Sequence, residues 1–121
     1  MDLSVLHEYG IDYKSGIARC LNDASLYEKV LMLFLEDTSL AHARIAFDRG
    51  DYSMLFVCLH ELKGAAGNAD LTELTLAVTP LVELLRRGGG TDAEIARMYD
   101  RVEAAYTTTR EGILQACGKA V

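Results

Sequence analysis

The sequence predicts an all-α fold, an antiparallel up-down four-helix bundle with a short additional N-terminal helix. Apolar residues recur at helical spacing through most of the chain, and the ten glycines lie largely at the breaks between these stretches. No segment shows the apolar-polar alternation of a strand. With 121 residues, half of them hydrophobic, the chain has the size and composition of one globular unit. We therefore expect residues 1–121 to form a single domain.

Two helices are predicted in the first half of the chain. A short one is expected at about residues 12–21, opened by Asp12. Ser25 and Glu28 form a capping box, which predicts the start of a long helix that reaches about residue 49. Gly50 ends this helix, because glycine adopts left-handed backbone angles at little cost. The early apolar stripe of the long helix consists of Leu26, Val30, Leu33 and Phe34.

Three helices are predicted in the second half. Asp51 caps a helix that reaches about residue 69, and Asp70 or Thr72 opens the next, which ends before Gly88. Pro80 lies inside this fourth helix, where it removes one backbone hydrogen bond and favours a local bend. The last helix is expected at about residues 91–117, opened by a capping box of Thr91 and Glu94 with a seam of apolar residues behind it. Because the connections are short, neighbouring helices are expected to run antiparallel.

Composition excludes several classes of function. The formal net charge of −6 argues against a nonspecific nucleic-acid binder, which needs clustered lysine and arginine. No apolar run is long enough to cross a bilayer, so we expect no membrane insertion and a cytoplasmic location. Cys20, Cys58 and Cys117 are widely spaced among apolar neighbours, which favours reduced structural thiols over a zinc site or a disulfide framework.

The helix at about residues 51–69 carries the informative side chains. On a helical wheel of about 100° per residue, one stripe gathers the apolar core positions. His60 points roughly away from the centre of that stripe and is therefore expected to be exposed. The stripe consists of Leu55, Leu59, Leu62, Ala66 and Ala69, and the residues near His60 are Ser53, Phe56, Val57, Lys63, Gly64 and Gly67.

Gly64 and Gly67 call for an explanation, since a glycine inside a helix costs about 0.5–1 kcal/mol relative to alanine. Gly64 lies one turn beyond His60, where a side chain would crowd the imidazole. Its absence would leave room for the active site of another protein, and the alternative is close packing against a neighbouring helix. Lys63 can reach the same patch, where an ammonium would stabilise a phosphoryl group on the histidine.

The other histidines show no such surroundings. His7 lies near the N-terminus, and His42 has no candidate ligand or catalytic partner at helical-neighbour spacing. A metal site at His60 is not expected either, because its neighbour Lys63 is cationic. We therefore expect no metal and no cofactor bound at His60.

The stretch His60–Ala66, HELKGAA, resembles the His-x-Leu-Lys-Gly-x-Ala/Ser signature of histidine phosphotransfer domains of bacterial phosphorelays. Segments on either side also resemble that family, so that the likeness covers about residues 8–90. One departure is that Ala69 and Asp70 stand where members usually have a large apolar residue and then glycine. The additional segments are Tyr9–Arg19, Leu26–Asp37, Gly50–Asp51 and Leu84–Gly88.

The resemblance implies a phosphocarrier without kinase activity. His60 would accept a phosphoryl group from an aspartate of a receiver domain, in a response regulator or hybrid kinase, and pass it to another receiver aspartate. Lys63 would give electrostatic support and Gly64 access, while the receiver would bring magnesium and most of the catalytic groups. The residues expected to contact the receiver are Ser53, Phe56, Val57 and Gly67, and the protein is expected to act as a monomer.

Two alternatives are also compatible with the sequence. The chain could be the N-terminal phosphotransfer domain of a chemotaxis-type histidine kinase, in which ATP bound elsewhere in the polypeptide is the phosphoryl donor. It could also be a module that docks receivers without transferring anything. The presence of both His60 and Lys63 argues against the second alternative.

Overall fold

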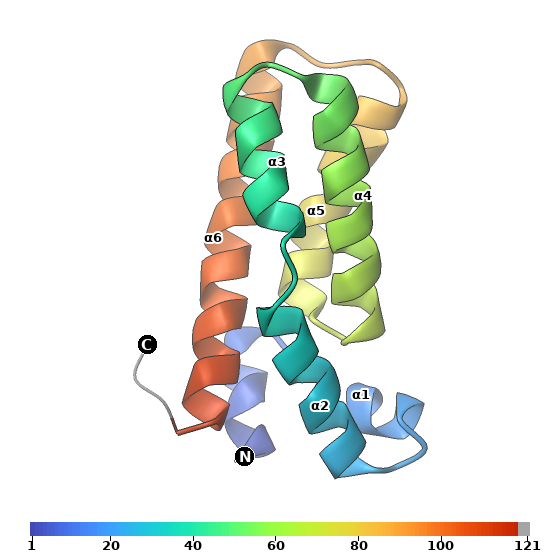
Figure 1. Ribbon diagram of the computed structural model, residues 1–121, viewed down its shortest axis with the longest axis vertical. Coiled ribbons are helices and arrows are strands. Elements are labelled where there is room, and N and C mark those ends of the chain that lie inside the picture. The colour runs from blue at the N-terminus through green and yellow to red at the C-terminus, as the bar shows by residue number, and fades with distance from the viewer. Residues whose placement is uncertain (119–121) are drawn as a thin grey trace.

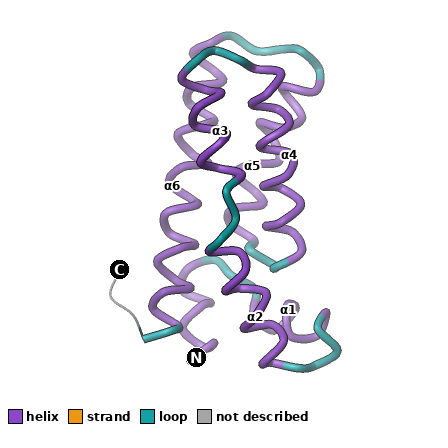
Figure 2. The backbone as a smooth tube through the Cα atoms, in the orientation of Figure 1, coloured by secondary structure: helices purple, strands orange, loops and turns teal. Residues whose placement is uncertain are grey.

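The computed structural model describes residues 1–118 and is helical throughout this part of the chain, with short loops and no strands (Figures 1 and 2). This confirms the predicted all-α class. The elements are a 3-10 helix η1 (Leu3–Tyr9) and the α-helices α1 (Tyr13–Arg19), α2 (Ala24–Leu35), α3 (Ser39–Asp48), α4 (Tyr52–Asn68), α5 (Thr72–Arg86) and α6 (Asp92–Ala116).

Four of these helices form an antiparallel bundle. α3 packs against α4, α4 against α5, and α5 against α6, while η1, α1 and α2 lie at one end of the bundle (Figure 1). Long side chains complete the contact between α3 and α6: Phe47 stacks on Tyr99 at 4.3 Å between ring centroids, and Arg44 pairs with Glu103. The chain begins beside the end of α6, where the Asp2 backbone N–H donates to the carbonyl of Ala116.

The predicted long helix at residues 26–49 is wrong, because the chain breaks between α2 and α3. The break falls at Glu36–Thr38, and the Asp37 carboxylate accepts a hydrogen bond from the Ser39 backbone N–H at 2.8 Å. Asp, Thr and Ser compete with the helix for backbone hydrogen bonds, so three of them in succession favour a new helix start. η1 was not predicted from the sequence either.

The start and the buried face of α2 also differ from the prediction. Asp23 caps the helix by accepting hydrogen bonds from the backbone N–H groups of Ser25 and Leu26, so Ser25 forms no capping box. The buried stripe is also shifted by about one residue from the predicted one. Leu26 and Leu33 are exposed, and the residues of α2 that are buried are Tyr27, Leu31 and Phe34.

α4 follows the prediction closely. Asp51 caps it by accepting from the Met54 backbone N–H at 3.1 Å. Its predicted core stripe is buried, with each member at most 1% exposed: Leu55, Leu59, Leu62, Ala66 and Ala69. Burial of a leucine side chain contributes about 1.5–3 kcal/mol, so this stripe holds α4 firmly in one rotation about its axis.

The turn after α4 explains the departure at Asp70. This residue has a φ of 54°, in the left-handed region where glycine is usual and aspartate is tolerated. Asp70 therefore does not cap α5; Leu71 occupies the capping position and its side chain makes no cap hydrogen bond. The Asp70 carboxylate instead accepts hydrogen bonds from Arg19 and Ser15, which fasten α1 to the end of α4.

The last two helices match their predicted bounds within a few residues. α5 continues through Pro80, which is exposed, and the carbonyl that loses its partner belongs to exposed Leu76 and can be hydrated. Thr91 caps α6, because its hydroxyl oxygen accepts a hydrogen bond from the Glu94 backbone N–H. The Thr91 hydroxyl in turn donates to the Glu94 carboxylate at 3.3 Å. In a full capping box that carboxylate would accept from the Thr91 backbone N–H, and this bond is not formed. The cysteines are free, with Cys58 buried and the other two only half-buried.

Candidate functional site

α4 presents His60 near its middle, on the face away from the core. The imidazole is exposed, while Leu59 and Leu62 on the opposite side are fully buried. The exposure predicted from the helical wheel is confirmed. Because the buried stripe fixes the rotation of α4, the histidine is held on the outer surface without any hydrogen bond of its own among the described residues.

The surface beyond His60 is open. A Cβ atom placed on Gly64 or on Gly67 would meet no heavy atom within 4 Å, apart from its chain neighbours and the backbone of its own helix. Close packing against a neighbouring helix is thereby excluded as the reason for either glycine within residues 1–118. Both glycines weaken the helix and gain no packing contact in return. They leave a bare strip of α4 surface next to the imidazole.

An aromatic ring lies against the other side of the histidine. Phe56, one turn before His60, places its ring centroid 5.8 Å from the imidazole centroid at an interplanar angle of 38°. Its ring is half-buried, and the guanidinium of Arg86 lies over it at 5.3 Å from the centroid. This distance is within the range of a cation–π contact. Phe56 is therefore partly covered, and both His60 and Arg86 lie against its ring.

A cluster of three charges lies on the same side of α4. The Lys63 ammonium is 3.9 Å from Oε1 of Glu83 on α5, and Nε of Arg86 is 3.5 Å from the same oxygen. One carboxylate oxygen thus faces two cations. The side chains concerned are about one-third to one-half exposed, so each pair contributes only about 0.2–1 kcal/mol to stability. The pairs can break and re-form at little cost in free energy.

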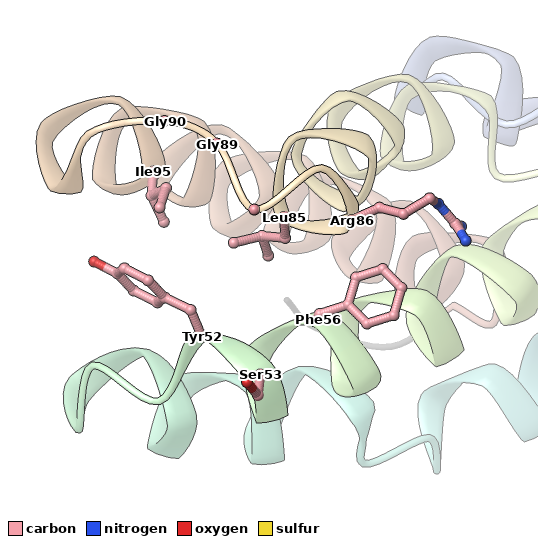
Figure 3. Close-up of a pocket in the computed structure, with 9 residues that line it drawn as sticks. Tyr52, Ser53, Phe56, Leu85, Arg86, Gly89, Gly90 and Ile95 are labelled. Carbon is pink, nitrogen blue, oxygen red and sulfur yellow. The ribbon is translucent and has the colours of Figure 1, made fainter.

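The predicted contact residues fall on two sides of His60. Ser53 and Phe56 line a cleft of about 470 Å³ between α4, the end of α5 and the glycine loop at residues 88–90 (Figure 3). Val57, 46% exposed, lies on the opposite side and lines a groove of about 320 Å³ between α3 and α4. Exposed Ile45 and Met54 line this groove as well.

The structure brings His60, Phe56 and Lys63 together beside Glu83 and Arg86, and it leaves the α4 surface open at Gly64. Ser53 is more distant, since seven residues span about 10 Å along a helix. No role for Glu83 or Arg86 is predicted from the sequence. A partial signal was present for Arg86 alone: Phe56 and Arg86 lie at similar distances from the turn at Asp70, and residues so placed in an antiparallel helical hairpin lie near each other.

Within residues 1–118 no group of three or more His, Cys, Asp or Glu side chains is placed to hold a metal ion. None of the described helices combines the length and the apolar character needed to span a bilayer. His7 and His42 are exposed, and each lies on a different helix from His60.

A helical bundle that presents a histidine beside a bare strip of helix surface is suited to phosphotransfer between proteins. The family model described as Hpt domain matches residues 29–112, which is more than half of the chain. The chain belongs to the Hpt domain family. No curated protein and no solved structure gave a match.

The matched range begins inside α2 and includes most of α6. It therefore covers the last helix better than the motif resemblance did, and it leaves out the N-terminal segment Tyr9–Arg19. Hpt domains carry out histidine phosphotransfer in phosphorelays and interact with receiver domains. The chain is accordingly a phosphotransfer module rather than a kinase.

Proposed function

We propose that this protein is a phosphorelay intermediate whose phosphoryl group is carried on His60. A ring nitrogen of His60 attacks the phosphorus of an aspartyl phosphate in a receiver domain. The N–P bond forms as the P–O bond breaks, and the electron pair of the broken bond stays with the aspartate as its carboxylate. The reverse step, to the aspartate of a second receiver, completes the relay.

The observation that carries the proposal is the open face around His60. The imidazole is exposed in the middle of a rigid helix, and Gly64 leaves the space beside it empty. In-line transfer requires the receiver aspartate to approach the ring closely, with both reacting atoms correctly oriented. Because the buried face of α4 fixes the rotation of this helix, His60 is presented outward with free space beside its ring, which permits that approach.

The neighbouring residues support the reaction in different ways. Lys63 supplies positive charge for the phosphoryl group, since a lysine three residues away lies on the same helix surface. Ser53, Phe56, Val57 and Gly67 provide the surface that the receiver contacts. Magnesium would be bound by the receiver and would neutralise charge on the transferring group. The chain itself contributes the nucleophile and a docking surface.

The test is a reconstituted relay with two receiver domains. The first receiver is phosphorylated with a radioactive label and freed of its donor, and the second is added with magnesium. We expect label to reach the second receiver when the wild-type chain is present and not when His60→Gln replaces it. His7→Gln, a change of an exposed histidine outside the site, should relay like the wild type. Relay through His60→Gln at the wild-type rate would refute the proposal.

A further inference from the structure

A carboxylate and two cations lie together beside His60. Of these three groups, the proposed relay mechanism uses only Lys63. Lys63 comes from α4, whereas Glu83 and Arg86 come from α5 and are three residues apart. Both cations approach the same oxygen of Glu83, at 3.9 Å and 3.5 Å. The cluster therefore holds one more positive charge than negative charge.

Arg86 and His60 both lie against the same aromatic side chain, Phe56. The Arg86 guanidinium lies 5.3 Å from the centre of the Phe56 ring, and the Phe56 ring lies 5.8 Å from the imidazole. Figure 3 shows Arg86 extending from α5 across Phe56. About half of the Arg86 side chain is exposed, so it can turn without disturbing the core. To approach His60, the guanidinium would move along the surface of the Phe56 ring.

The chemistry of arginine suits a phosphoryl group better than it suits Glu83 in the present geometry. A guanidinium has five N–H donors arranged as a fork that can bind two phosphoryl oxygens at once. At 3.5 Å its contact with Glu83 is longer than a well-formed charge-assisted hydrogen bond, which is about 2.7–2.9 Å. The guanidinium is thus only loosely held while the histidine is unmodified.

Phosphorylation of His60 would change the balance of charge. A phosphoryl group carries about −1.5 to −2 at neutral pH, against −1 for a carboxylate. The Coulomb attraction on each cation at a given distance would then be up to about twice that of Glu83. Glu83 would lose the competition for both cations once His60 is phosphorylated.

We propose that Arg86 is a second cation for the phosphoryl group on His60, and that Glu83 holds Arg86 and Lys63 in reserve while the histidine is unmodified. The proposal rests on the phosphorylation of His60 proposed above. It assigns opposite roles to two residues one turn apart on α5. Arg86 stabilises the phosphorylated state, and Glu83 destabilises it by competing for the cations, which keeps the group transferable.

The experiment loads the wild-type protein and three variants from a phosphorylated receiver and measures two quantities. The first is the equilibrium ratio of phosphorylated chain to phosphorylated receiver. We expect Arg86→Gln to lower this ratio about two- to fivefold and Glu83→Gln to raise it by a similar factor. Arg87→Gln removes the same charge from the neighbouring exposed position and should leave the ratio near the wild-type value.

The second quantity is the pH at which the phosphoryl group of the phosphorylated chain takes up a proton, followed by phosphorus NMR. A nearby cation favours the dianion, so Arg86→Gln should move this transition to higher pH and Glu83→Gln to lower pH. A role of Arg86 in folding alone would not move it. Failure of the wild-type chain to take up phosphate would overturn the proposed function and this inference together. Phosphorylation of all four proteins, with Arg86→Gln matching Arg87→Gln in both measurements, would overturn the inference alone.

Discussion

Replacing Gly64 by alanine tests whether this glycine is needed for close helix packing or instead leaves an open surface beside His60. A Cβ atom at this position meets nothing within 4 Å, so the substitution adds no clash and loses no packing. What remains is helix propensity, which favours alanine by about 0.5–1 kcal/mol. For a domain of this size that gain corresponds to a rise in Tm of about 2–4 °C. Gly64→Ala is therefore expected to stabilise the protein.

Urea unfolding followed by circular dichroism measures this change, and Gly16→Ala provides the contrast. Gly16 is also a glycine inside a helix, but its added Cβ would collide with the ring of Tyr27, which is fully buried. Overpacking of this kind costs about 1–3 kcal/mol, so the same substitution should destabilise the protein at Gly16. If Gly64→Ala also destabilises it, the open surface described here is wrong.

The functional half of the prediction uses a longer side chain. Gly64→Gln should keep the fold and slow phosphoryl transfer from a receiver, because the glutamine occupies the space beside the imidazole. Ala104→Gln adds a comparable side chain at an exposed position of α6 and should transfer normally. Wild-type transfer rates for Gly64→Gln would refute the view that Gly64 provides access.

Three further predictions concern the bundle itself. Leu59→Ala leaves a cavity at a fully buried position and should lower the free energy of unfolding, measured by urea titration, by about 2–5 kcal/mol. Thr109→Val removes a buried hydroxyl that has no hydrogen-bond partner among the described residues. The free energy of unfolding should therefore rise by up to about 1 kcal/mol, and a decrease would contradict this explanation. Burial raises the pKa of Glu103, but hydrogen bonds from Arg44 and Tyr99 outweigh burial and leave the pKa below its usual value. The stabilising effect of these hydrogen bonds is then present above the ordinary carboxyl pKa and lost as the pH falls through the lowered pKa of the folded state. Glu103→Gln should therefore lower the Tm most near pH 7 and little in strong acid, as measured by thermal unfolding.

The sequence predicts α4 well because its signals agree with one another. Asp51 supplies the cap, and the apolar stripe repeats at strict helical spacing, so both the start of the helix and its rotation follow from local chemistry. The exposure of His60 follows from that rotation alone. Whether Gly64 packs closely against another helix could not be decided from the sequence, because the answer depends on where the neighbouring helices lie.

The predictions from sequence fail in two kinds of place: where several residues compete to cap one helix, and where the outcome depends on contacts between two helices. Ser25 looked like a cap, but Asp23 two residues earlier accepts the same kind of hydrogen bond with a charged oxygen. A new helix, α3, begins at Ser39 inside an apolar pattern that appeared continuous, and the Asp37 carboxylate accepts a hydrogen bond from the Ser39 backbone N–H. The cluster of Glu83 with Arg86 and Lys63 depends on the register between α4 and α5, which no single segment of sequence determines.

The central claim is that the phosphoryl group is carried on His60. The most direct measurement is to map the modified residue by mass spectrometry at alkaline pH after incubation with a phosphorylated receiver and magnesium. We expect one phosphorylated peptide, containing His60, whose modification is lost in acid and stable in base, as for an N–P bond. Phosphorylation of His7, His42 or a hydroxyl side chain instead, or undiminished labelling of His60→Gln, would contradict the account.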